Sequence, residues 1–300
     1  MQLVETVREL QEFSEKERRA GRRVALVPTM GALHEGHLEL VHAARRCADR
    51  VVVSIFVNPT QFGPGEDYAA YPRPLEDDLA ACKTAGVDVV FAPDVSELYP
   101  AGAQTLVEVE RVAQPLCGAT RPGHFRGVTT VVTKLLVAAH PHAAVFGLKD
   151  FQQVAVIRRL ARDLCFDVEI VGVPTVREPD GLALSSRNVF LDEKTRPQAL
   201  ALGRALRAAE AAVAKGETAT EVLLGDVFDV LRRDAPLGQI DYAELRDPES
   251  LELAPAILTG PTLLALAVRF PIGSGDQRVR LIDNTVLRPF VAETHSEDSQ

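Results

Sequence analysis

The stretch Pro28-Thr29-Met30-Gly31-Ala32-Leu33-His34-Glu35-Gly36-His37 decides the fold, because it joins two different hydrophobic patterns. Residues 23–28 form a short apolar run, which is typical of a strand buried on both faces. Residues 36–48 carry apolar side chains at helical spacing. The stretch is therefore predicted to be a strand-to-helix loop at the edge of a parallel sheet where ligands bind.

The same alternation of strand and helix continues on the C-terminal side of this loop. Further strands are predicted at residues 51–57, 87–91, 143–146 and 167–173, and helices at residues 75–85, 129–139 and 150–164. Repeated strand–helix–strand units imply a parallel sheet with helical crossovers. We therefore expect a Rossmann-like α/β domain over residues 1–175.

The pattern changes near residue 175. Two helices are predicted at residues 196–215 and 218–233, followed by strands at residues 240–245, 262–270 and 279–286. Residues 273–276 are typical of a hairpin connection, and the polar tail at residues 293–300 is predicted to be frayed. Residues 176–300 should therefore form a smaller α+β domain.

Composition excludes several classes of protein. A net charge of −9 and a pI near 5.4 disfavour a nucleic-acid partner. The N-terminus is charged, and no apolar run is long enough to span a membrane. The four cysteines are isolated, which is typical of thiols in a reducing compartment. We expect a cytoplasmic protein without a membrane partner.

His34 and His37 are the first candidates for chemistry. They are three positions apart and can share one face of a helical turn, and Gly31 and Gly36 allow close approach of the backbone to a ligand. A helix N-terminus favours phosphate, and two imidazoles can donate to developing phosphate charge. Taken alone, the pair could also be surface residues of a capping turn. A zinc site is less consistent, because the spacing is one residue shorter than that of metalloproteases.

Two further polar segments follow strands or lie at the proposed domain boundary. Lys149, in the sequence Gly147-Leu148-Lys149-Asp150, offers a compact positive charge for a phosphoryl oxygen, and Asp150 could instead cap the next helix. Ser185, Ser186 and Arg187 can hydrogen-bond a triphosphate, although a plain turn is the alternative.

Three segments complete the candidate set. Asn58 and Gln61 follow the second strand and can bind hydroxyls and carboxylates without carrying charge. Asp77 and Asp78 either stabilise the start of a helix or contact magnesium. Residues 121–127 form a basic loop before a helix, which could be a binding loop or an ordinary surface loop.

Together these motifs closely resemble the pantothenate synthetase (pantoate–β-alanine ligase) family. The matching segments are PTMGALHEGH (28–37), FVNPTQF (56–62), AYPRPLEDDL (70–79), RPGHFRGV (121–128), GLKDFQQ (147–153) and VPTVREPDGLALSSRN (173–188). The resemblance implies the fold of the nucleotidylyl-transferring superfamily that carries an HxGH motif. It also implies ATP-dependent condensation of pantoate with β-alanine, through a pantoyl adenylate, to give pantothenate, AMP and pyrophosphate.

The resemblance also implies roles for individual residues. His37, His34, Lys149 and Arg187 would be catalytic, with His37 the proton donor. Pantoate would bind to Gln61 and Gln153, and β-alanine near Gln61. The ATP-binding residues would be Met30, Gly31, Ala32, Leu33, His34, Glu35, Gly36, His37, Gly147, Leu148, Lys149, Asp150, Val176, Leu184, Ser185, Ser186 and Arg187.

Magnesium, approached by Asp77 and Asp78, and a homodimer are implied in the same way. The loop at residues 184–187 and the second domain are expected to close over the site. The nearest alternative is another HxGH nucleotidylyltransferase whose acceptor is a phosphate ester. Gln61 and Gln153 disfavour it, because an acceptor phosphate would require more cations. A non-catalytic nucleotide sensor would bind ATP without releasing AMP.

Overall fold

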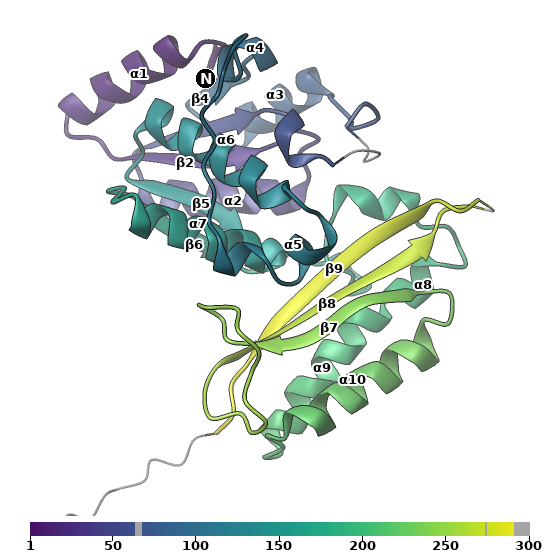
Figure 1. The fold of residues 1–300 in the computed structure, drawn as a ribbon. Coiled ribbons are helices and arrows are strands. Elements are labelled where there is room, and N and C mark those ends of the chain that lie inside the picture. Colours follow the sequence, from purple (N-terminus) through teal and green to yellow (C-terminus); the bar gives the residue numbers. More distant parts are fainter. Residues whose placement is uncertain (64–67, 274, 291–300) are drawn as a thin grey trace, which may run out of the picture. The chain divides into compact units, whose positions relative to one another are not determined.

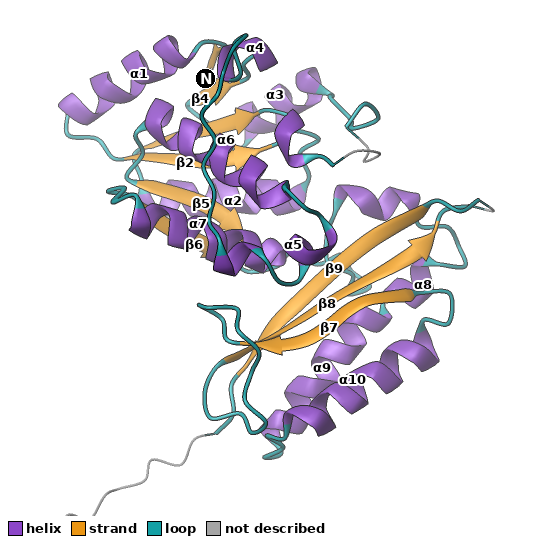
Figure 2. Cartoon of the chain, in the orientation of Figure 1, coloured by secondary structure: helices purple, strands orange, loops and turns teal. Residues whose placement is uncertain are grey.

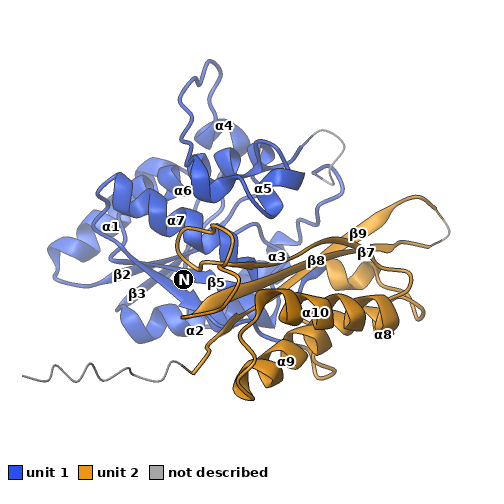
Figure 3. Cartoon of the chain, turned by 60° about the horizontal axis from the view of Figure 1, so that its bottom comes forward, with its two compact units in different colours: residues 1–177, 184–186 blue, residues 178–183, 187–300 orange. Residues whose placement is uncertain are grey.

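The computed structural model describes residues 1–63, 68–273 and 275–290, which fold as two compact units (Figure 3). The first contains residues 1–177 and 184–186, and the second contains residues 178–183 and the chain from residue 187 onward. The predicted tail and Ser274 of the predicted hairpin lie outside the described residues. The predicted division into domains at residues 175 and 176 stays a prediction.

A parallel sheet forms the centre of the first unit (Figure 1). Its strands are β1 (Gln2–Val4), β2 (Val24–Thr29), β3 (Arg50–Ile55), β4 (Val89–Phe91), β5 (Ala143–Gly147) and β6 (Glu169–Val173). The strand order is β1-β4-β3-β2-β5-β6, and every pairing is parallel. The predicted Rossmann-like sheet is confirmed. The sequence did not predict β1, a three-residue edge strand beside charged residues.

Helices cover both faces of this sheet (Figures 1 and 3). The helices α2 (Glu35–Cys47) and α3 (Leu75–Thr84) pack on one face, where Val27, Val41 and Cys82 share a core. The helices α1 (Val7–Arg19), α6 (His124–Ala139) and α7 (Phe151–Asp163) cover the other face. Because successive strand side chains point to opposite faces, the β-branched runs fill both cores.

Local signals explain where two of these helices begin. At α1, Thr6 Oγ1 accepts from the Glu9 amide at 3.2 Å, and Glu9 Oε2 accepts from the Thr6 amide at 3.0 Å, which is a capping box. At α6, Gly123 adopts a left-handed conformation with φ 82°, which glycine tolerates without strain. Therefore α6 begins at His124, five residues before its predicted start.

The second unit is an antiparallel sheet with helices on one face (Figure 2). Its elements are α8 (Arg196–Ala199), α9 (Ala201–Ala214), α10 (Thr220–Asp234), β7 (Gln239–Arg246), β8 (Thr262–Pro271) and β9 (Arg278–Leu287). The strand order is β7-β8-β9, and Leu206, Val227 and Phe270 lie in one buried core. The predicted helix at 196–215 is divided at Leu200.

Candidate active site

The topology brings the predicted segments to one edge of the parallel sheet. Strand β2 lies between β3 and β5, and β6 pairs with the far side of β5. Thr29 pairs with Ile55, and Gly147 pairs with Val173, so these four strands end at the same level. The order of strands in sequence reverses at β2, and in such sheets ligands bind outside the carboxyl ends at this point.

The histidine motif lies at this switch point and begins α2. His34 is the N-cap residue, and its backbone N–H donates to His37 Nδ1 at 3.3 Å. The two imidazole rings lie 4.1 Å apart between centroids. A Cβ on Gly36 would come within 2.9 Å of His34 Cε1. Glycine at position 36 therefore leaves room for the His34 ring.

His37 is a neutral imidazole at physiological pH. Burial, and then the neighbouring His34, lower its pKa to about 3; Asp150 opposes this shift and Lys149 adds to it. Because Nδ1 accepts from the backbone, the neutral ring carries its proton on Nε2. Among the described residues, none accepts a hydrogen bond from that nitrogen. The ring can therefore donate to an oxygen of a ligand.

The segment after β5 supplies the positive charge. Lys149 Nζ lies 3.8 Å from Asp150 Oδ2, and the lysine side chain is about one-fifth exposed. Asp150 is at the N-cap of α7 but makes no capping hydrogen bond, so the predicted alternative of a capping role is not realised. The Leu148 side chain lies over Gly172 of β6, where a Cβ would come within 2.8 Å of it. Leu148 therefore packs on the sheet.

Gln61 lies after β3 and is held through its amide. Its Nε2 donates to Met30 Sδ at 2.8 Å, and its Oε1 accepts from Asn58 Nδ2 at 3.1 Å. Asn58 is buried and also donates to the Gly127 carbonyl at 3.1 Å, while its Oδ1 accepts from Tyr99 at 2.9 Å. This network joins the predicted pantoate residue Gln61 to Met30 in the loop between β2 and α2 (residues 30–34), which we call the histidine loop.

The loop at residues 121–127 holds the backbone of Gln61. The Gln61 carbonyl lies 2.8 Å from His124 Nδ1 and accepts from Arg121 at 3.4 Å. A Cβ on Gly127 would come within 2.2 Å of the Thr60 carbonyl oxygen. The sequence indicated a basic loop at this place but gave no sign that α6 approaches residues 60 and 61 so closely.

Comparison with known proteins agrees with this geometry. The family model for pantoate-beta-alanine ligase matches residues 2–286. A pantothenate synthetase of Geobacter sulfurreducens is 54% identical over 287 residues, covering 96% of this chain and 99% of the relative. The chain belongs to the pantoate–β-alanine ligase family.

Solved structures of the family share the fold. A pantothenate synthetase from Thermus thermophilus has a TM-score of 0.89 and 47% identity, covering 96% of this chain and 100% of that one. A pantoate-beta-alanine ligase from Francisella tularensis, complexed with beta-gamma ATP and beta-alanine, has a TM-score of 0.75 and 33% identity. The latter match covers 95% of this chain and 97% of that one. The predicted fold of the HxGH superfamily is therefore confirmed.

Two neighbouring glutamines of this family member have different environments. Gln152 is buried in α7, where its amide donates to the carbonyls of Val112 and Pro115 and accepts from the Cys117 amide. Gln153, the predicted pantoate residue, is half-buried on the same turn. Gln152 therefore shapes the loop before α6 and leaves the predicted substrate role to Gln153.

The two predicted magnesium residues also differ. Asp77 is exposed on α3, whereas Asp78 is 3% exposed and accepts from the amides of Ala32 and Leu33. Burial raises the pKa of Asp78, and these two hydrogen bonds oppose that shift. In the described part of the chain, no group of three or more His, Cys, Asp or Glu side chains could hold a metal ion.

The segment at residues 176–188 contributes to both units. In the first unit, the Leu184 amide donates to the Val176 carbonyl at 2.9 Å, and Leu184 Cδ2 lies 3.6 Å from the Cβ position of Gly36. Ser185 and Ser186 belong to this unit and are half-buried, whereas Arg187 belongs to the second. In the second unit, Asn188 is buried and donates to the Ala183 carbonyl at 3.0 Å.

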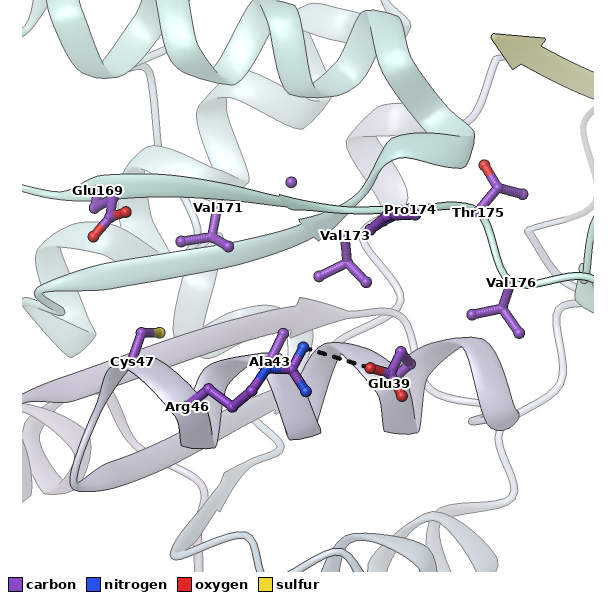
Figure 4. Close-up of a pocket in the computed structure, with 11 residues that line it drawn as sticks. Glu39, Ala43, Arg46, Cys47, Glu169, Val171, Val173, Pro174, Thr175 and Val176 are labelled. Carbon is purple, nitrogen blue, oxygen red and sulfur yellow. Dashed lines mark ion pairs between the residues drawn. The ribbon is translucent and has the colours of Figure 1, made fainter.

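A groove of about 600 Å³ lies between α2 and the edge strand β6 (Figure 4). Glu39 and Arg46 of α2 form an ion pair at 3.5 Å along it, facing Val171 and Val173 of β6. Of the predicted ATP residues within the described ranges, Val176 alone lines this groove. The groove follows the sheet edge, so its volume does not locate the chemistry.

Proposed function

We propose that this chain condenses pantoate with β-alanine in an ATP-dependent reaction, and that the site at the carboxyl edge of the parallel sheet carries it out. One observation supports this site above the others. The histidine motif and Lys149 follow β2 and β5, which are adjacent strands at the topological switch point. A member of this family that places two imidazoles and an ammonium group there has the donors that a polyphosphate requires.

The first step forms an acyl adenylate. A carboxylate oxygen of pantoate attacks the α-phosphorus of ATP in line, and the bond to the bridging oxygen of pyrophosphate breaks. His37 donates through Nε2–H to the phosphate oxygens, and Lys149 stabilises the developing negative charge. We propose the roles that the family resemblance implies for His34, whose ring lies 4.1 Å from that of His37 between centroids, and for the guanidinium group of Arg187. Positioning and charge stabilisation suffice, because the enzyme forms no covalent bond.

The second step forms the amide. The amine of β-alanine attacks the acyl carbon of pantoyl adenylate, loses a proton, and expels AMP. Gln61 and Gln153 hold pantoate through neutral amides, and Gln61 also lies near β-alanine. The network of Asn58, His124 and Arg121 supports this role, since it fixes both the side chain and the carbonyl of Gln61.

Magnesium enters with the nucleotide in this proposal. Mg²⁺ prefers octahedral oxygen ligands and keeps several waters, so the phosphates and waters can supply most of its shell. The described residues build no metal cage, and Asp77 is the exposed carboxylate of the predicted pair. The role of Asp77 is thus confined to contact through water or the phosphates.

We also propose that the chain forms a homodimer. The edge strand β6 has its outer side unpaired within the described chain and borders the groove along α2, which would allow a second copy to pack there. Sedimentation equilibrium would give the mass directly, and a monomer at micromolar concentration would refute this part. No helix within the described residues is long and apolar enough to cross a membrane. A cytoplasmic location stays a prediction.

The decisive experiment omits each substrate in turn. AMP release should require ATP, pantoate and β-alanine together. Exchange of labelled pyrophosphate into ATP should require pantoate but not β-alanine, because the adenylate forms before the amine reacts. Absence of exchange would contradict the adenylate. If pyrophosphate were released with a phosphate ester as acceptor, in the absence of β-alanine and without release of AMP, the result would instead indicate the alternative nucleotidylyltransferase.

A further inference from the structure

The backbone between β2 and α2 is held by side chains of the protein itself. Thr29 Oγ1 accepts from the Gly31 amide at 3.2 Å and donates to the Ser54 carbonyl at 2.7 Å. The next two amides, of Ala32 and Leu33, donate to Asp78 Oδ2 and Oδ1 at 2.9 and 2.7 Å. One buried carboxylate on α3 therefore takes up two successive N–H groups of the histidine loop.

The conformation of the loop makes this support necessary. Gly31 and Ala32 both have left-handed φ angles, of 79° and 51°. Such a conformation is unfavourable for alanine and persists only where the surrounding structure holds it. A Cβ on Gly31 would come within 2.8 Å of Asp78 Oδ2, so the carboxylate sits directly against this turn. Asp78 therefore supplies the contacts that hold this turn.

We propose that Asp78 is a positioning residue for adenylate formation, which acts by fixing residues 31–33 and thereby the placement of His34 and His37. This inference rests on the proposed function. It replaces the predicted magnesium contact of Asp78, because the side chain is buried away from solvent and its carboxylate is directed at two backbone N–H groups. It also means that the amides of Ala32 and Leu33 are not donors to ATP phosphates.

The test compares Asp78→Asn with Glu76→Gln, which changes an exposed carboxylate in the same first turn of α3. Asparagine can accept only one of the two hydrogen bonds and presents an NH₂ group to the other amide. We expect kcat/KM for MgATP to fall about tenfold or more in Asp78→Asn, as for loss of a hydrogen bond to a charged group. The Mg²⁺ concentration that gives half-maximal rate should stay at the wild-type value. Glu76→Gln should match wild type throughout.

Hydrogen–deuterium exchange supplies a readout that needs no catalysis. The peptide that covers residues 31–33 should exchange faster in Asp78→Asn than in wild type or Glu76→Gln, while the peptides of β2 stay protected. A several-fold rise in the Mg²⁺ requirement, with the rate restored at high Mg²⁺, would overturn the proposal in favour of a magnesium ligand. Wild-type kinetics and exchange in Asp78→Asn would also overturn it. If wild type released no AMP, the proposed function would fail, and exchange would still decide whether Asp78 holds the loop.

Discussion

The two edges of the parallel sheet carry similar residue types, but the hydrogen-bond partners of these residues differ. At the amino edge, buried Glu17 accepts from Arg22 and, at 2.9 Å, from Arg50, while His142 Nδ1 accepts from the Val24 amide at 3.0 Å. At the carboxyl edge, His37 also accepts a backbone N–H, but its second nitrogen is left for a ligand. The partners at the amino edge lie on or beside the starts of strands, so they serve stability. Each edge therefore has a histidine that accepts a backbone N–H, and we propose a catalytic role only for the one at the carboxyl edge.

The largest expected effect compares one histidine from each edge. His37→Ala should lower the turnover of AMP release by about 10²-fold or more, as does loss of a single donor to developing charge in other enzymes. His142→Ala should leave the turnover of the folded enzyme unchanged. It should lower the free energy of unfolding by about 1–3 kcal/mol, because the Val24 amide loses its acceptor.

Steady-state kinetics and urea unfolding of both variants would check whether His37→Ala loses turnover and His142→Ala loses stability. If His142→Ala lost turnover at temperatures where it stays folded, the functional division between the two edges would be wrong. Near-normal turnover of His37→Ala would remove His37 from the catalytic residues.

A smaller effect is expected where α6 meets the loop after β3. In Gly127→Ala, the new Cβ would lie 2.2 Å from the Thr60 carbonyl oxygen and 2.6 Å from the Gln61 amide nitrogen, so this backbone must shift. Overpacking of this kind costs about 1–3 kcal/mol. We expect the KM for pantoate to rise about tenfold, the equivalent of 1.4 kcal/mol, while the KM for ATP changes less.

Gly225→Ala is the matched control for this variant. Gly225 lies within α10 of the second unit, and apart from its chain neighbours and the nearby backbone of α10, no atom of the described residues lies within 4 Å of its Cβ position. Alanine there should stabilise the protein by about 0.5–1 kcal/mol, since it favours the helix. A larger rise in the KM for ATP than for pantoate in Gly127→Ala would contradict the assignment of Gln61.

The sequence was sufficient to predict the order of the main elements and the segments that meet at the carboxyl edge. The β-branched runs and the helical spacing of Val154, Ile157 and Leu160 are local signals, and these three side chains are buried as that spacing requires. Strand β1 was missed because three residues carry too little pattern. The break at Leu200 was missed because alanine and leucine favour helix on both sides of it.

The functions of individual polar residues were less predictable, because they depend on contacts distant in sequence. Asp77 and Asp78 are equivalent in sequence, but only the structure shows that Asp78 is buried against Ala32 and Leu33. Likewise, nothing local distinguishes Gln152, which shapes a loop, from Gln153. Residue type and position after a strand locate the site, whereas long-range packing assigns the role within it.

The smallest expected effect distinguishes the amino edge of the parallel sheet from the carboxyl edge by the pH range in which each loses stability. Arg22, and with it Arg50, lowers the pKa of Glu17 from 4.5 to about 2, against the opposing effect of burial. Because its pKa is lower in the folded protein, ionised Glu17 stabilises the fold at pH values above the pKa of the unfolded chain. This stabilisation is lost as the pH falls from about 4.5 to about 2. The pKa of His37 is lowered from 6.5 to about 3, so the protein begins to lose stability as the pH falls below 6.5, where the unfolded chain binds a proton that the folded protein does not.

Glu17→Gln should therefore flatten the fall in unfolding free energy below pH 4.5 and leave the slope between pH 6.5 and 4.5 unchanged. Urea unfolding from pH 7 to 3 measures both ranges, and other carboxylates titrate equally in wild type and variant. Equal slopes below pH 4.5 would show that Glu17 contributes nothing to acid stability, and a changed slope above it would mean that the two edges are coupled.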